Sequence, residues 1–138
     1  MPTNFNVQII SPDKTILNTD TEEVIIPSYE GYMTILKDHI SLITFLRPGY
    51  IIINLTNQKK KFFVEEGTVE FFENKLLILS SSIKDINELS QNERQELIQL
   101  SEKKLKENIS DKEKYEIAHK IESLKEIYNL FDLCNFHY

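Results

Sequence analysis

The hydrophobic pattern of this chain changes its period once, near residues 80–89, and no other sequence feature constrains the fold as strongly. Before the change, apolar residues such as Phe5, Val7 and Ile9 alternate with polar ones, and turn sequences such as Pro27-Ser28 and Pro48-Gly49 interrupt short apolar runs. A period of two over many short segments predicts an antiparallel β-sandwich, which we place at residues 1–84. The runs are Val24–Ile26, Ile51–Ile53, Phe62–Val64 and Leu76–Leu79.

After the change the period is helical, and neither glycine nor proline occurs. Ser90 with Glu93, and Ser110 with Glu113, have the spacing of capping boxes, which mark the starts of two helices. The connection between the two helices is short, and it therefore predicts an antiparallel two-helix hairpin over residues 85–138. The hairpin ends in a short apolar tail from Tyr128. The expected apolar stripes are Leu97, Leu100 or Ser101, Leu105 and Ile109 in the first helix, and Ile117, Ile121, Leu124, Tyr128 and Phe131 in the second.

Composition narrows the functional class. The 138 residues carry a formal charge of −6, which disfavours nucleic acid and anionic membranes as partners. The one cysteine, Cys134, predicts a reducing compartment. We expect no signal peptide and no direct membrane insertion, because no apolar run approaches the roughly 20 residues that span a bilayer.

Residues with catalytic spacing are missing. The three glycines are too far apart to form a phosphate-binding loop, and His39, His119 and His137 have no metal-ligand spacing. We therefore expect no enzyme activity, no cofactor and no metal.

The candidate sites are surfaces for partners. Glu30, Gly31, Tyr32 and Met33 are interpreted either as a simple turn or as an exposed loop tip that contacts a partner. His39 is either a histidine bonded to backbone or a partner contact. The lysines of the helical part are either a solvated surface or a docking face for an acidic partner; they include Lys103, Lys104, Lys112, Lys114 and Lys120.

One stretch also carries a family resemblance. Residues 30–42 read EGYMTILKDHISL and are followed by Pro48-Gly49. This order resembles the signature Glu-Gly-x-x-Gly-Ile-Leu-x-x-His-x-x-Leu, then Pro-Gly, of the epsilon subunit of the F-type ATP synthase, which is called delta in mitochondria. Residues 66–71 and 5–12 are similar to two further elements of that family. The resemblance extends through the helical hairpin.

The resemblance implies a non-catalytic subunit of the central stalk, in the F1 sector at the cytoplasmic face of the bacterial inner membrane. Its β-sandwich binds the gamma subunit and the c-subunit ring, with Glu30–Met33 toward the ring and His39 near gamma. Its helical hairpin regulates the enzyme: when extended, its lysines transiently contact the catalytic beta (and alpha) subunits and inhibit ATP hydrolysis.

Some family members carry a nucleotide-binding motif, Ile/Leu-Asp-x-x-Arg-Ala, at the start of the first helix. Here Ser90 stands in place of the aspartate and Glu93 in place of the arginine, so ATP binding is not expected. Three other hypotheses remain open from the residues alone. They are a free-standing β-sandwich adaptor, a small enzyme that uses His39 and Glu30 as acid and base, and a nucleotide sensor.

Overall fold

The computed structural model describes the backbone of residues 3–136 and the side chains of residues 3–125, and it divides the chain into two compact units. The first unit ends at Asp85 and the second begins at Ile86. The sequence analysis places this boundary one residue earlier. The difference arises because β10 (Lys84–Asp85) pairs with β7, which keeps Asp85 in the sheet.

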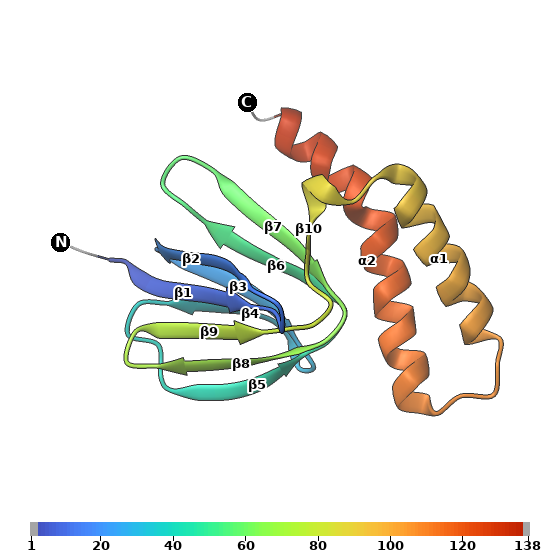
Figure 1. Ribbon diagram of the computed structural model, residues 1–138, viewed down its shortest axis with the longest axis horizontal. Helices are drawn as coiled ribbons and strands as arrows, with labels where there is room; N and C mark the ends of the chain where they lie inside the picture. The colour runs from blue at the N-terminus through green and yellow to red at the C-terminus, as the bar shows by residue number, and fades with distance from the viewer. Residues whose placement is uncertain (1–2, 137–138) are drawn as a thin grey trace. The chain divides into compact units, whose positions relative to one another are not determined.

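Ten strands form the first unit within the described residues (Figure 1). Segments of alternating burial match the expected period of two; β1, for instance, buries every second side chain. The strands are β1 (Phe5–Ile10), β2 (Thr15–Thr21), β3 (Glu23–Ser28), β4 (Gly31–Leu36), β5 (Leu42–Leu46), β6 (Gly49–Asn54), β7 (Lys59–Val64), β8 (Gly67–Phe72), β9 (Lys75–Leu79) and β10.

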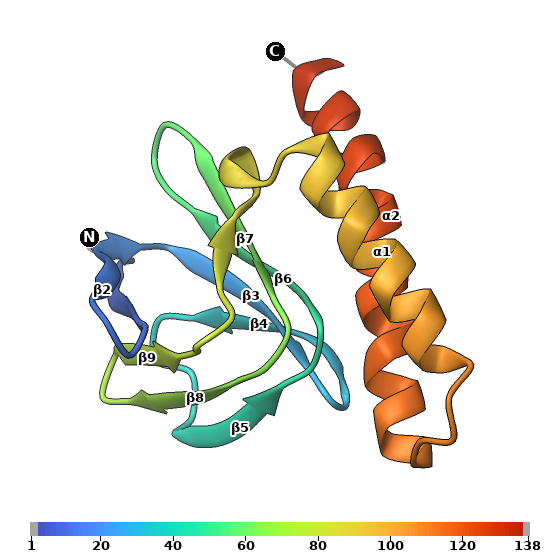
Figure 2. The ribbon, with the colours of Figure 1, turned by 45° about the vertical axis from the view of Figure 1, so that its right-hand side comes forward.

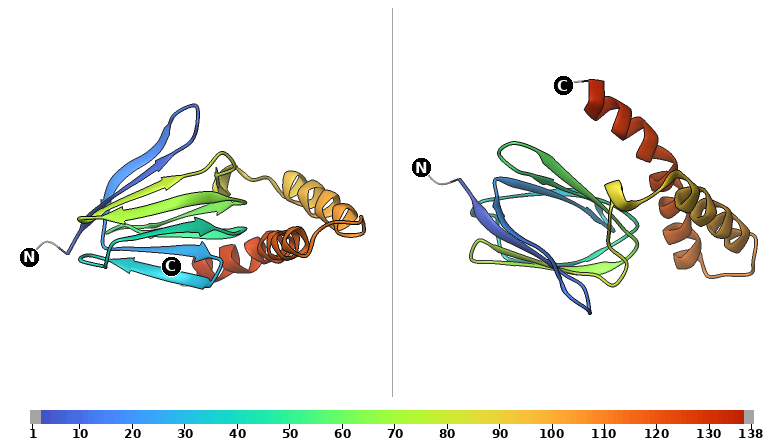
Figure 3. Two further views of the ribbon diagram at one scale, coloured as in Figure 1. Left: turned by 90° about the horizontal axis from the view of Figure 1, so that it is seen from below. Right: turned by 45° about the horizontal axis from the view of Figure 1, so that its top comes forward.

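The strands form two layers joined at β3, and the curled sandwich is visible in Figure 3. One layer has the order β10-β7-β6-β3-β4, and the other has the order β5-β8-β9-β1-β2. The predicted β-sandwich is confirmed. All pairs are antiparallel except β1 with β9, which is parallel. These two strands lie far apart in sequence, so no tight turn forces them to run in opposite directions.

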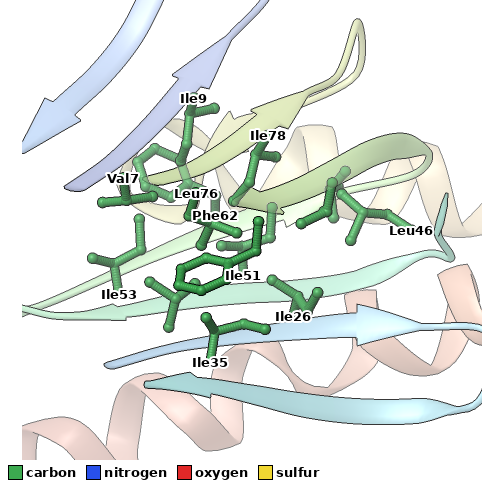
Figure 4. Close-up of a cluster of buried hydrophobic side chains, with 14 of the residues drawn as sticks. Val7, Ile9, Ile26, Ile35, Leu46, Ile51, Ile53, Phe62, Leu76 and Ile78 are labelled. Carbon is green, nitrogen blue, oxygen red and sulfur yellow. The ribbon is translucent and has the colours of Figure 1, made fainter. Parts of the chain in front are cut away.

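A cluster of buried apolar side chains lies between the two layers and forms the core. Figure 4 shows Val7, Ile9 and Ile78 of one layer pointing toward Ile26 and Ile51 of the other, and all five are fully buried. Burying such a side chain contributes about 1.5–3 kcal/mol each. The core also contains Phe5, Val24, Ile35, Leu46, Ile53, Phe62, Val64, Val69, Phe71 and Leu76.

Pro27 and Ser28 differ from the expectation, because both lie in β3 and not in a turn. One edge of β3 pairs with β4 over its whole length. The other edge pairs with β6 as far as Ile25 and with β5 at Ser28. Proline has no N–H to donate, and it therefore fits where the strand changes its partner.

The second unit contains a short 3₁₀ helix, η1 (Ile86–Glu88), followed by α1 (Gln91–Leu105) and α2 (Asp111–Phe136). The two α-helices lie side by side and antiparallel (Figure 2), as the predicted hairpin requires. Both serine caps are present: the Oγ of Ser90 accepts from the N–H of Glu93 at 3.1 Å, and the Oγ of Ser110 accepts from that of Glu113 at 3.2 Å.

The stripe of α1 uses Ser101 in preference to Leu100. Ser101 is buried, whereas Leu100 is 64% exposed. Leu97, Ser101 and Leu105 are four residues apart and share one face of the helix, and Leu100 lies off that face. In α2, Ile117 and Leu124 are buried and Ile121 is half-buried. The side chains of Tyr128, Phe131 and the rest of the tail lie outside the described residues.

Replacing Ile78 with alanine tests the core. We expect Ile78→Ala to lower the free energy of unfolding by about 2–5 kcal/mol, because the side chain is fully buried and leaves a cavity. Urea unfolding followed by circular dichroism measures the loss. Ile43→Ala is the matched control, since Ile43 is 76% exposed in a neighbouring part of the same layer. Equal losses in the two variants would contradict the assignment of the core.

Candidate partner-binding surface

The β3–β4 connection is a two-residue turn formed by Tyr29 and Glu30, and both side chains are exposed. The Oγ of Ser28 donates to the carbonyl of Gly31 at 2.7 Å across the turn. Gly31 has φ +121°, in a region that favours glycine. The predicted tip, Glu30–Met33, is therefore too long. Gly31, Tyr32 and Met33 belong to β4, where Tyr32 pairs with Pro27, and Met33 packs against the core.

Tyr32 makes contacts within the unit although 51% of its surface is exposed. Its hydroxyl oxygen accepts a hydrogen bond from the backbone N–H of Tyr50 at 3.2 Å. Its ring lies 4.9 Å from the guanidinium carbon of Arg47. The side chain is therefore oriented before any partner binds.

His39 lies in the loop between β4 and β5 and is half-buried. Its ring Nδ1 is 2.8 Å from the carbonyl oxygen of Ile40, and its ring meets the edge of Phe71 at 5.9 Å. The loop is held by Asp38 and Asn74: the Asn74 amide donates to the Asp38 carboxylate at 3.0 Å, and the Asp38 N–H donates to the Asn74 side chain at 2.7 Å. The backbone-bonded interpretation of His39 therefore has a structural basis.

Glu30 and His39 do not form an acid–base pair. The six residues of β4 separate them and span about 20 Å, since a strand rises about 3.3 Å per residue. They stand at opposite ends of one strand, so the proposed small enzyme has no site. Among the described residues, no group of three or more His, Cys, Asp or Glu side chains is arranged to hold a metal ion.

A group of exposed apolar side chains forms a candidate binding surface that was not predicted from the sequence. Ile43 and Phe45 on β5 are 76% and 61% exposed, and Phe72 and Leu79 on β8 and β9 are 54% and 43% exposed. The pairing of β5 with β8 and of β8 with β9 places them on the outer side of one layer, with Phe45, Thr68 and Leu79 in one row. We call Ile43, Phe45, Phe72 and Leu79 the outer apolar face.

The outer apolar face has a sequence signal in hindsight. Residues 42–46 and 76–79 are almost continuously apolar. In a sandwich strand with one face in solvent, apolar and polar residues are expected to alternate. Groups of exposed apolar side chains mark candidate surfaces for other molecules, and here Thr68 and Glu70 of β8 lie between the apolar residues of β5 and those of β9. This face therefore adds to the site that the turn and His39 begin.

The predicted lysines are distributed around the hairpin. Lys103, Lys104, Lys112 and Lys114 are exposed, and Lys120 is half-buried. Lys112 and Lys114 point in nearly opposite directions, because successive residues of a helix are turned by about 100°. Lys103 and Lys104 lie in the last turn of α1, where cations also stabilise the helix dipole. The helices thus present separate basic points and not one basic face.

The comparisons with known proteins decide the family. A family model described as "ATP synthase, Delta/Epsilon chain, beta-sandwich domain" matches residues 4–85. The chain belongs to the delta/epsilon family of ATP synthase subunits. The expected non-catalytic subunit is confirmed by this membership.

The helices in the described part of the chain include none that is long and apolar enough to cross a membrane.

Proteins named ATP synthase epsilon chain match this chain along most of their length. The chain is 41% identical to the ATP synthase epsilon chain of Pelagibacter ubique over 127 residues, which is 91% of this chain and 98% of that protein. It is 28% identical to the chloroplastic ATP synthase epsilon chain of Gracilaria tenuistipitata over 117 residues, with 85% and 87% coverage.

Solved structures share the fold. A chain in the mitochondrial ATP synthase of Euglena gracilis superposes with a TM-score of 0.74 at 14% identity, covering 95% of this chain and 83% of that one. A chain in the central stalk and c-ring structure of the Tetrahymena thermophila mitochondrial ATP synthase gives 0.63 at 17% identity, covering 91% and 94%.

The turn supplies a test of its own. We expect Gly31→Ala to lower the free energy of unfolding by about 1–3 kcal/mol, because an alanine at this φ is strained. Steric crowding does not contribute, since an added Cβ meets nothing within 4 Å. Glu30→Ala, one residue away and exposed, is the control and is expected to be nearly neutral. Urea midpoints of both variants decide, and an unchanged midpoint for Gly31→Ala would refute the strained turn.

Proposed function

We propose that this chain is the epsilon-type subunit of the central stalk of a rotary F-type ATP synthase, and that it turns with the rotor and performs no chemistry. It couples proton-driven rotation of the c-subunit ring to ATP synthesis. The observation that carries this proposal is the outer apolar face on a subunit of the delta/epsilon family. The complex lies at the cytoplasmic face of a bacterial inner membrane, and this chain is attached there through its partners.

The outer apolar face is the proposed contact for the gamma subunit. Four large apolar side chains protrude from three neighbouring strands, and burying each contributes about 1.5–3 kcal/mol before the cost of association. The paired strands present these side chains from an ordered backbone, so that binding costs mainly side-chain entropy, which favours a permanent interface. His39 lies beside β5, at the end of the strand that carries Ile43, and is assigned to the same contact.

The β3–β4 turn is the proposed contact for the c-subunit ring. Glu30 is exposed at its tip, and Gly31, Tyr32 and Met33 follow in β4. A charged group and an amphipathic tyrosine suit a polar partner loop, because each offers hydrogen bonding as well as contact area.

The helical hairpin is the proposed regulator of ATP hydrolysis. Its exposed lysines Lys103, Lys104, Lys112 and Lys114, with Lys120, make transient contacts with acidic loops of the beta and alpha subunits. Because these cations are solvated and scattered, each contact contributes less than about 1 kcal/mol and weakens with salt. Such contacts suit reversible inhibition and not permanent assembly.

Truncating the outer apolar face tests the gamma contact. We expect the double variant Ile43→Ala/Phe45→Ala to weaken binding to the co-expressed gamma subunit about 10- to 100-fold, since each truncation costs about 1 kcal/mol or more at an interface. Size-exclusion chromatography with mass detection and a titration measure the change. Leu100→Ala is the control, because it removes an equally exposed apolar side chain from α1. Separate elution of the wild-type chain from gamma would favour the free-standing adaptor.

Removing the hairpin tests the regulatory role. We expect a chain that ends at Leu89 to assemble with the other subunits and to raise ATP hydrolysis at low ATP concentration. A full-length variant with Lys103 and Lys104 changed to glutamine separates the charges from the rest of the hairpin and should give part of the increase. Unchanged hydrolysis in both, or failure of the truncated chain to assemble, would contradict the proposal.

A further inference from the structure

Arg47 is a buried cation near the β3–β4 turn. Only 7% of its surface is exposed, although arginine is seldom buried without a charged partner. No ion pair with a carboxylate is formed by Arg47 among the side chains of residues 3–125. Its guanidinium instead donates to the carbonyl of its neighbour Pro48 at 2.7 Å and lies over the ring of Tyr32. The ring and one carbonyl thus replace the water that the cation loses.

The same contacts connect three strands. Tyr32 is in β4, Arg47 precedes β6 in the connection from β5, and the N–H that the Tyr32 hydroxyl accepts belongs to Tyr50 in β6. The backbone N–H of Arg47 donates to the carbonyl of Pro27 in β3 at 3.0 Å. Arg47 therefore links the turn to the point where the two layers of the sandwich join.

Gly49 makes this arrangement possible. A Cβ at this position would lie 2.7 Å from the Cβ of Pro27 and 3.0 Å from the hydroxyl oxygen of Tyr32. Any larger residue would push Tyr32 or Pro27 away. Gly49 of β6 is thus packed closely against both Pro27 of β3 and the Tyr32 hydroxyl of β4.

We propose that Arg47 and Tyr32 are positioning residues that hold the turn Tyr29–Glu30 in one place on the sandwich, and that this stiffness is needed for coupling. The second part rests on the proposed contact of the turn with the ring. The β3–β4 pairing continues to Ser28 and Gly31 beside the turn, so the position of the turn depends on how firmly the ends of these two strands are held. The contact of Arg47 with the Tyr32 ring fixes the start of β4 to the rest of the unit, and a force on the turn is therefore transmitted to the sandwich.

Arginine is required for this role, and lysine does not replace it. The guanidinium carbon lies over the Tyr32 ring, 4.9 Å from its centre, while Nη1–H donates to the Pro48 carbonyl, and arginine holds its donors in one fixed plane. A lysine ammonium keeps the charge but offers neither the plane nor the fixed donor geometry. Arg47→Lys and Arg47→Met should therefore behave alike, which would not hold if charge alone mattered.

A spin label at the tip measures the positioning directly in the full-length chain. Glu30→Cys in a Cys134→Ser background provides a single labelling site. We expect Arg47→Met and Arg47→Lys to raise the population of the mobile label about fivefold, equivalent to about 1 kcal/mol. Tyr32→Phe, which keeps the ring, should give a smaller rise, and Tyr32→Leu the full one. Lys14→Met, which removes an exposed charge from the β1–β2 connection, is the control. Circular dichroism at the same temperature verifies that each variant is folded. An unchanged label in Arg47→Met overturns the positioning role.

The assembled enzyme tests the consequence. In membrane vesicles we expect Arg47→Met and Tyr32→Leu to lower the number of protons pumped per ATP hydrolysed about twofold, while binding to the gamma subunit stays at the wild-type level. A mobile tip with an unchanged pumping ratio overturns the need for stiffness. A wild-type label whose spectrum does not change on assembly contradicts the ring contact itself, and the label mobility of the free chain still decides whether Arg47 and Tyr32 position the turn.

Discussion

The pairing of β3 with three neighbours is the constraint on which the rest of the β unit depends. β3 pairs with β4 on one edge and, on the other, first with β6 and then with β5, so it belongs to both layers. Pro27 lies at the change of partner, where its missing N–H does no harm and its carbonyl accepts from Arg47. The core residues of both layers face one another only because this strand joins them.

The proposed partner contacts also depend on β3, the strand that joins the two layers. The turn after β3 places Tyr29 and Glu30 at one end of the sandwich, and β5, which begins after His39, carries Ile43 and Phe45 along its outer side. A rotor subunit has to hold two partners at once without changing shape. A sandwich with a closely packed core of apolar side chains meets that need, because close-packed interiors deform little.

Among the described side chains, the helical unit has fewer buried apolar ones than the β unit. Its caps at Ser90 and Ser110 define where the helices start, but its buried residues include the serines Ser101 and Ser123. An ion pair between the helices, Lys125 with Glu102 at 3.3 Å, is largely exposed. Exposed pairs of this kind contribute little. Modest burial and solvated charges suit a segment that is proposed to change its contacts during regulation.

The sequence by itself determined the two-part architecture, the helix starts and, by its order of motifs, the family. These depend on local signals: a period of two or 3.6, a serine before a helix, and a glycine in a turn. Only the tertiary structure decided the parallel pairing of β1 with β9, the inclusion of Pro27 in a strand, and the choice of Ser101 over Leu100. It alone separated Glu30 from His39 and brought Arg47 over Tyr32. The physical reason is that pairing partners, strand edges and close approaches join residues distant in sequence, and no local pattern encodes which distant residue will occupy the facing position.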